Sequence, residues 1–143
     1  MDKDAIKMIE KEISVFIRRI VITEKQNNLL ERSAYVLLRQ LSVEGPAGVK
    51  SLSEQLDLDI STVSRQAAAL EQKKYIDKFP NPKDGRSYFY QITELGIKEL
   101  EDNRQNRYDR LSEILTEWSD EEKQTFGLLL KKYNQTILEK TKK

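Results

Sequence analysis

The residues best suited to chemistry in this sequence are the small and polar side chains of the segment 60–74. On a helix, at about 100° per residue, one face of this segment carries Ser61, Thr62, Arg65, Ala68 and Ala69. Small residues let a helix backbone approach a duplex, hydroxyls bind phosphates or base edges, and an arginine can bind guanine O6 and N7 together. An alanine can contact a thymine methyl group. The pattern therefore predicts a helix that enters the major groove of DNA.

The rest of the same segment divides into a core face and two flanks. We expect four side chains to face the core: Ile60, Val63, Ala67 and Leu70. Ser64 and Gln66 lie on the flanks, where contact with phosphates is the expected role. Asp59 is a good N-cap, and its carboxylate opposes DNA binding unless a capping bond holds it aside. The alternative is a surface helix whose outward face is merely polar.

A second group of cations lies at 83–86, where Lys83 and Arg86 flank Asp84-Gly85. An arginine on a narrow, projecting turn suits a DNA minor groove, which concentrates negative potential. We expect Asp84 to hold Arg86 or Arg65 in position by a charge-assisted hydrogen bond. The alternative is an exposed turn with incidental charges.

These two groups are positioned by a compact middle segment. Helices are expected over 49–56 and from 60 to about 74, with Leu58 in the short connection, which is a helix-turn-helix pattern. Aromatic and β-branched residues predict strands over 75–79 and 87–92, joined by a turn over 80–86. The expected fold is a mainly α (α+β) winged helix-turn-helix.

Long amphipathic helices are expected on both sides of this middle segment. One covers 4–27, a second runs from about 31 to 43, and Gly45 to Gly48 then breaks the chain. A long helix carries Ile97, Leu100, Tyr108, Leu111, Leu115 and Trp118 on one face. Ser119 and Glu122 form a capping box that begins a last helix.

The outer helices carry more apolar surface than the chain itself easily covers. We expect eight residues to pack against a second copy of the chain: Ile6, Ile9, Ile13, Phe126, Leu129, Leu130, Tyr133 and Ile137. The alternative is a self-contained helical bundle.

Composition excludes several classes of function. The 143 residues include no histidine and no cysteine, so imidazole bases, thiolate nucleophiles, disulfides and zinc fingers are excluded. We find no acid/base pair, no glycine loop for phosphate and no metal-ligand cluster, and we expect neither an enzyme nor a bound metal or cofactor. Without a recognisable signal peptide or membrane span, we expect a soluble cytoplasmic protein. The net charge is only +1, so affinity for a polyanion depends on local placement of cations.

Taken together, the motifs resemble the MarR family of bacterial transcription regulators over nearly the whole chain. The matching segments are Leu52 to Leu56, Ser61 to Arg65, Leu70-Glu71, Asp84 to Arg86 and Ile92 to Gly96. The resemblance implies a homodimer in which 1–30 and 97–143 form the dimerisation region and 31–96 the winged-helix lobe. It implies one palindromic DNA site, with half-sites about 10 bp apart. A repressor is the expected role.

Many relatives release DNA when a small aromatic molecule binds between the lobes. The corresponding cleft here is expected to be lined by Phe16, Ile17, Ile20, Tyr35 and Leu38, although the same residues are ordinary core candidates. The sequence also departs from the family pattern. Lys74 stands where a glycine usually ends the recognition helix, which predicts a different exit geometry, and Gly85 replaces a frequent second arginine of the wing. The missing cysteines and histidines exclude peroxide sensing and disfavour zinc sensing.

A helical protein–protein interaction module, with a winged helix that does not bind DNA, is the alternative function. It would explain the neutral net charge.

Overall fold

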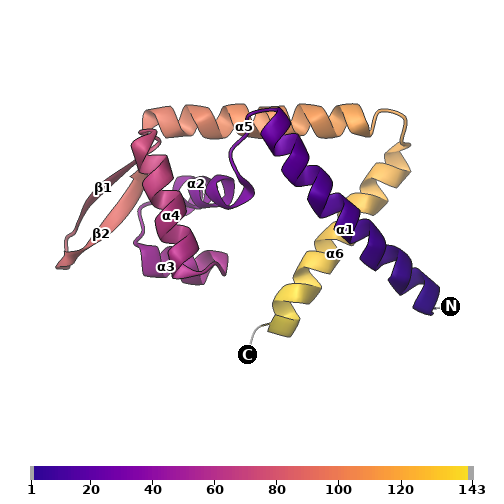
Figure 1. Cartoon of the computed structure of the whole chain (residues 1–143), viewed down its shortest axis with the longest axis horizontal. Coiled ribbons are helices and arrows are strands. Elements are labelled where there is room, and N and C mark those ends of the chain that lie inside the picture. The colour runs from indigo at the N-terminus through magenta and orange to yellow at the C-terminus, as the bar shows by residue number, and fades with distance from the viewer. Residues whose placement is uncertain (1, 142–143) are drawn as a thin grey trace. The chain divides into compact units, whose positions relative to one another are not determined.

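The structure is a computed structural model that describes residues 2–141. The elements follow the order α1 (Asp2–Gln26), α2 (Arg32–Glu44), α3 (Val49–Leu56), α4 (Ile60–Gln72), β1 (Ile76–Asn81), β2 (Asp84–Ile92), α5 (Glu94–Ile114) and α6 (Asp120–Thr141) (Figure 1). The expected mainly helical winged helix-turn-helix is confirmed. The chain divides into two compact units, 1–104 and 105–143.

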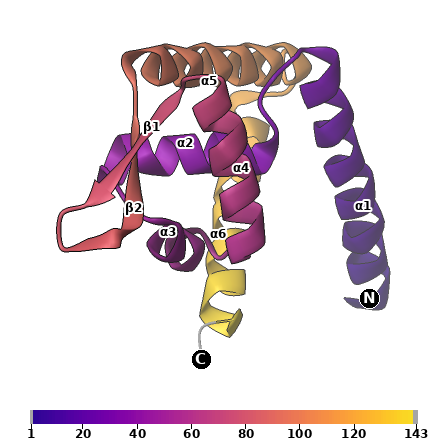
Figure 2. The ribbon, with the colours of Figure 1, turned by 60° about the vertical axis from the view of Figure 1, so that its left-hand side comes forward.

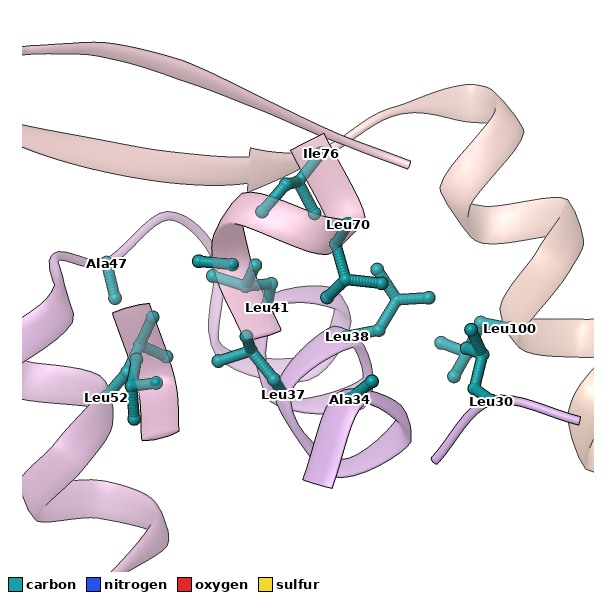
Figure 3. Packing of buried hydrophobic residues seen from close by; sticks show 12 residues of the cluster. Leu30, Ala34, Leu37, Leu38, Leu41, Ala47, Leu52, Leu70, Ile76 and Leu100 are labelled. Atoms are coloured by element: carbon teal, nitrogen blue, oxygen red, sulfur yellow. The ribbon is translucent and has the colours of Figure 1, made fainter. Parts of the chain in front are cut away.

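The first unit contains a lobe in which α2, α3, α4 and the β1–β2 hairpin enclose one apolar core. Leu37, Leu38 and Leu41 of α2 lie at its centre, with Leu52 of α3 and Leu70 of α4 around them (Figure 3). Leu100 brings the first half of α5 into the same core. Each fully buried leucine contributes about 1.5–3 kcal/mol, so this core fixes α4 on one side and leaves its other side free.

The hairpin is an antiparallel pair in which Ile76 faces Ile92 and Pro80 faces Tyr88. An isolated bridge between Ala47 and Tyr90 attaches it to the segment before α3. The strands extend further into the expected turn than their composition predicts, and only residues 82–83 connect them. The register shifts after Pro80, because Asn81 faces Asp84. Residues 85–87 therefore bulge outward at the tip of the hairpin.

Helix α4 ends at Gln72, two residues before the expected end. Lys74 has a φ of +66°, which is the left-handed conformation that usually requires glycine. The Tyr75 N–H donates to the Leu70 carbonyl (3.0 Å) and the Lys74 N–H to the Glu71 carbonyl (2.9 Å), which is a Schellman motif. The predicted change in exit geometry is therefore wrong, because Lys74 itself adopts the conformation that a glycine would supply.

Other expected boundaries differ by small amounts. Helix α5 ends at Ile114, so Leu115 and Trp118 lie beyond it and not on its apolar face. The capping box is confirmed: the Glu122 N–H donates to Ser119 Oγ (3.1 Å) and the Ser119 N–H to Glu122 Oε1 (2.9 Å).

Ile60 is 56% exposed, so its assignment to the core is wrong. Its direction is within about 20° of Ala67, but it is the first residue of α4 and lies at the edge of the lobe, where the core does not cover it.

Helices α1 and α6 bury little of their apolar surface within the described chain. Glu24 is the one buried residue of α1, and α6 has none between Asp120 and Thr141. No helix between residues 2 and 141 is long and apolar enough to cross a membrane.

Candidate nucleic-acid interface

Helix α4 presents the expected face to solvent. Ser61, Ser64, Arg65 and Ala68 are exposed, and Thr62 is half-buried. Val63 and Ala67 on the opposite side are fully buried against the core. The apolar contacts of the helix therefore orient a strip of small side chains, with one guanidinium, outward from the lobe.

Asp59 occupies the N-cap position of α4, but its side chain makes no capping hydrogen bond in the described structure. Its backbone carbonyl accepts the Val63 N–H (3.0 Å), so the helix begins where the sequence predicts. The expected capping bond is absent, and the carboxylate remains exposed at the start of the helix. A nearby phosphate would therefore meet an unfavourable charge at this point.

Gln66 lies inside the lobe, and its expected position on an exposed flank is wrong. Its side chain is only 4% exposed. The amide Nε2 donates to Glu31 Oε2 (2.7 Å) and to Ser33 Oγ (2.9 Å), both at the start of α2. Gln66 thus fixes α4 to α2, and its amide is occupied by protein partners.

The tip of the hairpin is ordered by a short polar network. Asp84 Oδ1 accepts the Arg86 N–H (3.1 Å) and lies 3.4 Å from Arg86 Nε. Asn81 Oδ1 accepts the Lys83 N–H (2.9 Å). The contact expected between Asp84 and Arg86 is therefore present, while the guanidinium stays exposed and free to bind an anion. Its part in binding DNA stays a prediction.

The start of α4, helix α3 and the tip of the hairpin gather at one end of the lobe, away from the first turns of α5 (Figures 1 and 2). Arg65 lies in the second turn of α4, and Lys83 and Arg86 lie at the tip. The two groups of cations therefore belong to the same end of the lobe.

A polar network that sequence reasoning missed connects the end of α4 to α5. Burial, together with the charge and hydrogen bond of Glu99, raises the pKa of Tyr75. Asn103 is buried, donates to Glu99 Oε2 (3.0 Å), and accepts the Leu30 N–H through Oδ1 (3.0 Å). A Cβ on Gly96 would lie 2.1 Å from the Tyr75 carbonyl, so only glycine permits this contact. No periodic signal marks a buried asparagine on a helix with so many charges.

The five residues expected to line a ligand cleft do not line a common cavity. Leu38 is fully buried in the core, while Phe16 and Ile17 of α1 are 47% and 57% exposed. Two cavities stand out in the described chain, and neither includes any of the five. One, of about 630 Å³, lies between α3 and the hairpin. The other, of about 440 Å³, is lined by residues from Val21 to Val36 and by Leu58.

The residues expected at a dimer interface are exposed in the described chain. Ile6 is 63% exposed, and Leu129 and Tyr133 are 58% and 48% exposed. Ile9, Phe126, Leu130 and Ile137 are also accessible, and Ile13 is half-buried. The described residues contain no group of three or more acidic side chains that could hold a metal ion.

Comparison with known proteins agrees with this geometry. Residues 30–88 match the model of the MarR family. YxaD of Bacillus subtilis (strain 168), described as an uncharacterized HTH-type transcriptional regulator, is 47% identical over 141 residues, which cover 96% of this chain and 99% of YxaD.

Two solved structures share the fold at lower identity. The transcriptional regulator BldR from Sulfolobus solfataricus has a TM-score of 0.72 at 20% identity, and the match covers 98% of this chain and 99% of BldR. The transcriptional regulator PcaV from Streptomyces coelicolor, solved in complex with its natural ligand, has a TM-score of 0.66 at 20% identity. That match covers 85% of this chain and 91% of PcaV.

Proposed function

The chain belongs to the MarR family of DNA-binding transcriptional regulators, and on that premise we propose that it binds a palindromic operator as a homodimer. The family is not a class of enzymes. We propose that each protomer places α4 in a major groove and the tip of its hairpin in the adjacent minor groove.

One observation carries the proposal: the face of α4 with Ser61, Arg65 and Ala68 is exposed, while the opposite face is locked into the core. We assign direct base contacts to Arg65 and Ala68, and contacts to phosphates or base edges to Ser61, Thr62 and Ser64. Lys83 and Arg86 bind the minor groove, and Asp84 orients Arg86. Gln66 is left out of this set, because its amide is held inside the lobe.

Dimerisation supplies the second lobe that a palindrome requires. We assign it to 1–30 and 97–143, through the exposed apolar stripes of α1 and α6, and we assign 31–96 to the DNA-binding lobe. Two-fold symmetry then requires half-sites about 10 bp apart. A dimer that covers two successive grooves of a promoter excludes other proteins from it, which favours a repressor.

We also propose that a small aromatic ligand releases the operator, as an extension of the family resemblance. The 440 Å³ cavity supports this extension, because its walls include Val21, Leu29 and Val36 together with Glu31 and Ser33. The last two side chains accept the amide of Gln66. A ligand that bound Glu31 or Ser33 would withdraw a hydrogen bond from α4 and so disturb its position.

The test is a gel-shift titration with the DNA upstream of the chain's own gene, at about 50 and 150 mM salt. Retardation that survives excess unrelated duplex is expected, and addition of hydroxybenzoic acids is expected to reverse it. Absence of retardation at micromolar protein would reject DNA binding and favour the interaction module. Retardation that no hydroxybenzoic acid reverses would reject ligand release alone.

A further inference from the structure

The cavity of about 630 Å³ between α3 and the hairpin is an open groove whose opposite walls carry cations. Lys50 and Ser51 lie on the α3 wall, and Lys78 lies on the hairpin wall with Ser87 and Tyr88. We propose that this groove holds the sugar–phosphate backbone of the bound duplex, and that Lys50 and Lys78 neutralise its phosphates. This inference rests on the proposed function.

The lysine on the hairpin is held in place. The Lys78 ammonium lies 4.7 Å from the centre of the Tyr88 ring, a cation–π contact that restricts a flexible side chain. A cation positioned before binding loses less conformational freedom when it meets a phosphate. Lys50 on the other wall is exposed, so both ammonium groups are accessible to an anion.

Hydroxyl groups in the groove are also suited to phosphate oxygens. Ser51 Oγ accepts a hydrogen bond from Gln55 Nε2 (3.1 Å), which leaves the serine proton available to donate. Phe89 and Gly48 also line the groove, and a Cβ on Gly48 would lie 3.2 Å from the Tyr88 carbonyl. Glu54 is the one acidic residue among those that line the groove.

The groove continues directly into the tip of the hairpin. Asn81 and Ser87 line the groove and are hydrogen-bonded to each other (3.2 Å). Ser87 Oγ also donates to the backbone carbonyl of Asp84 (3.2 Å). The side chain of the same Asp84 accepts the Arg86 N–H. When the tip of the hairpin lies in the minor groove of DNA, the adjacent sugar–phosphate backbone therefore passes next into the groove between α3 and the hairpin. An exposed groove with charged walls suits this extended polyanion better than a small ligand, which needs an enclosed, mostly apolar pocket.

The experiment measures DNA affinity against salt concentration for Lys50→Ala and Lys78→Ala, on operator and on unrelated duplex. Each variant is expected to reduce the slope of log K against log salt by about 1.8, which is about 0.9 for each protomer of the dimer, equally on both duplexes. Between about 50 and 200 mM salt, each variant then loses about 12-fold less affinity than the parent does. Both residues are exposed, so thermal unfolding should change little.

Controls separate charge from structure. Lys50→Arg and Lys78→Arg keep the charge and should keep the slope, as should Lys98→Ala, which removes an exposed lysine of α5. Glu54→Gln should bind both duplexes more tightly at about 50 mM salt, because a carboxylate facing phosphate is removed. Slopes of Lys50→Ala and Lys78→Ala equal to that of the parent would overturn this inference, while the proposed function would stand. A parent that binds neither duplex would overturn the proposed function itself.

Discussion

Arg65 and Arg86 are both exposed arginines, but their surroundings predict different roles. Arg65 projects from the rigid face of α4, and Arg86 projects from a bulged hairpin tip. Arg65→Ala should cost about 1–3 kcal/mol at each half-site of the operator, or about 5- to 150-fold in affinity per half-site, and relax the preference for one base pair there. Arg86→Ala should weaken operator and unrelated duplex evenly and reduce the salt slope by about 1.8, because the dimer carries the change twice. Fluorescence anisotropy on both duplexes measures these quantities.

A matched control for these two variants is Arg104→Ala, since Arg104 is an exposed arginine of α5 paired with Glu101 (3.3 Å). It should bind both duplexes like the parent. Operator preference that survives Arg65→Ala unchanged would contradict base recognition by this helix.

We expect Tyr75 to make the free energy of unfolding depend on pH in the alkaline range. Burial first, and then the charge and hydrogen bond of Glu99, raise its pKa above the usual value of about 10. Because the pKa of Tyr75 is higher in the folded than in the unfolded state, its neutral form stabilises the folded protein fully below about pH 10. This contribution to the free energy of unfolding is lost as pH rises through the folded pKa. The free energy of unfolding of the parent should therefore fall above about pH 10, and this part of the fall should be absent in Tyr75→Phe.

Chemical denaturation from pH 7 to 11 measures this difference between parent and variant. At pH 7, Tyr75→Phe should be about 1 kcal/mol less stable, because the hydrogen bond to Glu99 is lost. The other titrating groups act equally in both proteins. Parallel pH profiles for parent and variant would exclude a perturbed Tyr75.

At the scale of elements, the left-handed Lys74 lies where α4 passes into the hairpin. A residue with a Cβ costs about 1–2 kcal/mol of stability in this left-handed conformation. Replacement by glycine removes that cost, but it also increases the conformational entropy of the unfolded chain, which lowers stability by about 0.5–1 kcal/mol. Lys74→Gly should therefore raise the free energy of unfolding by about 0.5–1 kcal/mol, as measured by urea titration. Lys73 is the matched control: its φ is −81°, so Lys73→Gly should destabilise by a similar amount. Equal effects of the two changes would refute local strain at Lys74.

Most elements follow from local patterns, and the exceptions have a common physical cause. Helix α3 begins and ends at the predicted residues, because Leu52 and Leu56 define one short apolar stripe after Gly48. Gln66 is buried although it was expected on an exposed flank, and Ile60 is exposed although it was expected in the core. Periodicity gives the direction of each side chain, but not how far the neighbouring elements extend over it. Asn103 is buried through a bond to Leu30, 73 residues away, and no local pattern encodes such a partner.

The candidate site was partly predictable for the same reason. The outward positions of Ser61, Arg65 and Ala68 follow from helical geometry alone. The groove between α3 and the hairpin depends on two elements that are separated in sequence, and it becomes visible only when the bridge between Ala47 and Tyr90 brings them together. The ligand cleft failed because it required α1 to cover α2, whereas Leu38 is already covered by the lobe.

At the scale of the whole molecule, the apolar stripe of α6 requires a partner, and we propose a second copy. Leu129 on the stripe and Leu128 on the opposite side are almost equally exposed, at 58% and 59%. Leu129→Glu should raise the dimer dissociation constant at least about a hundredfold, because each leucine contributes about 1.5–3 kcal/mol and two-fold symmetry introduces the change twice. Leu128→Glu introduces the same charge at the same exposure and should leave the dimer intact. Sedimentation equilibrium measures both, and operator affinity should fall only with Leu129→Glu, because a lone lobe contacts one half-site. A dimer that tolerates both changes equally would show that this stripe is not the interface.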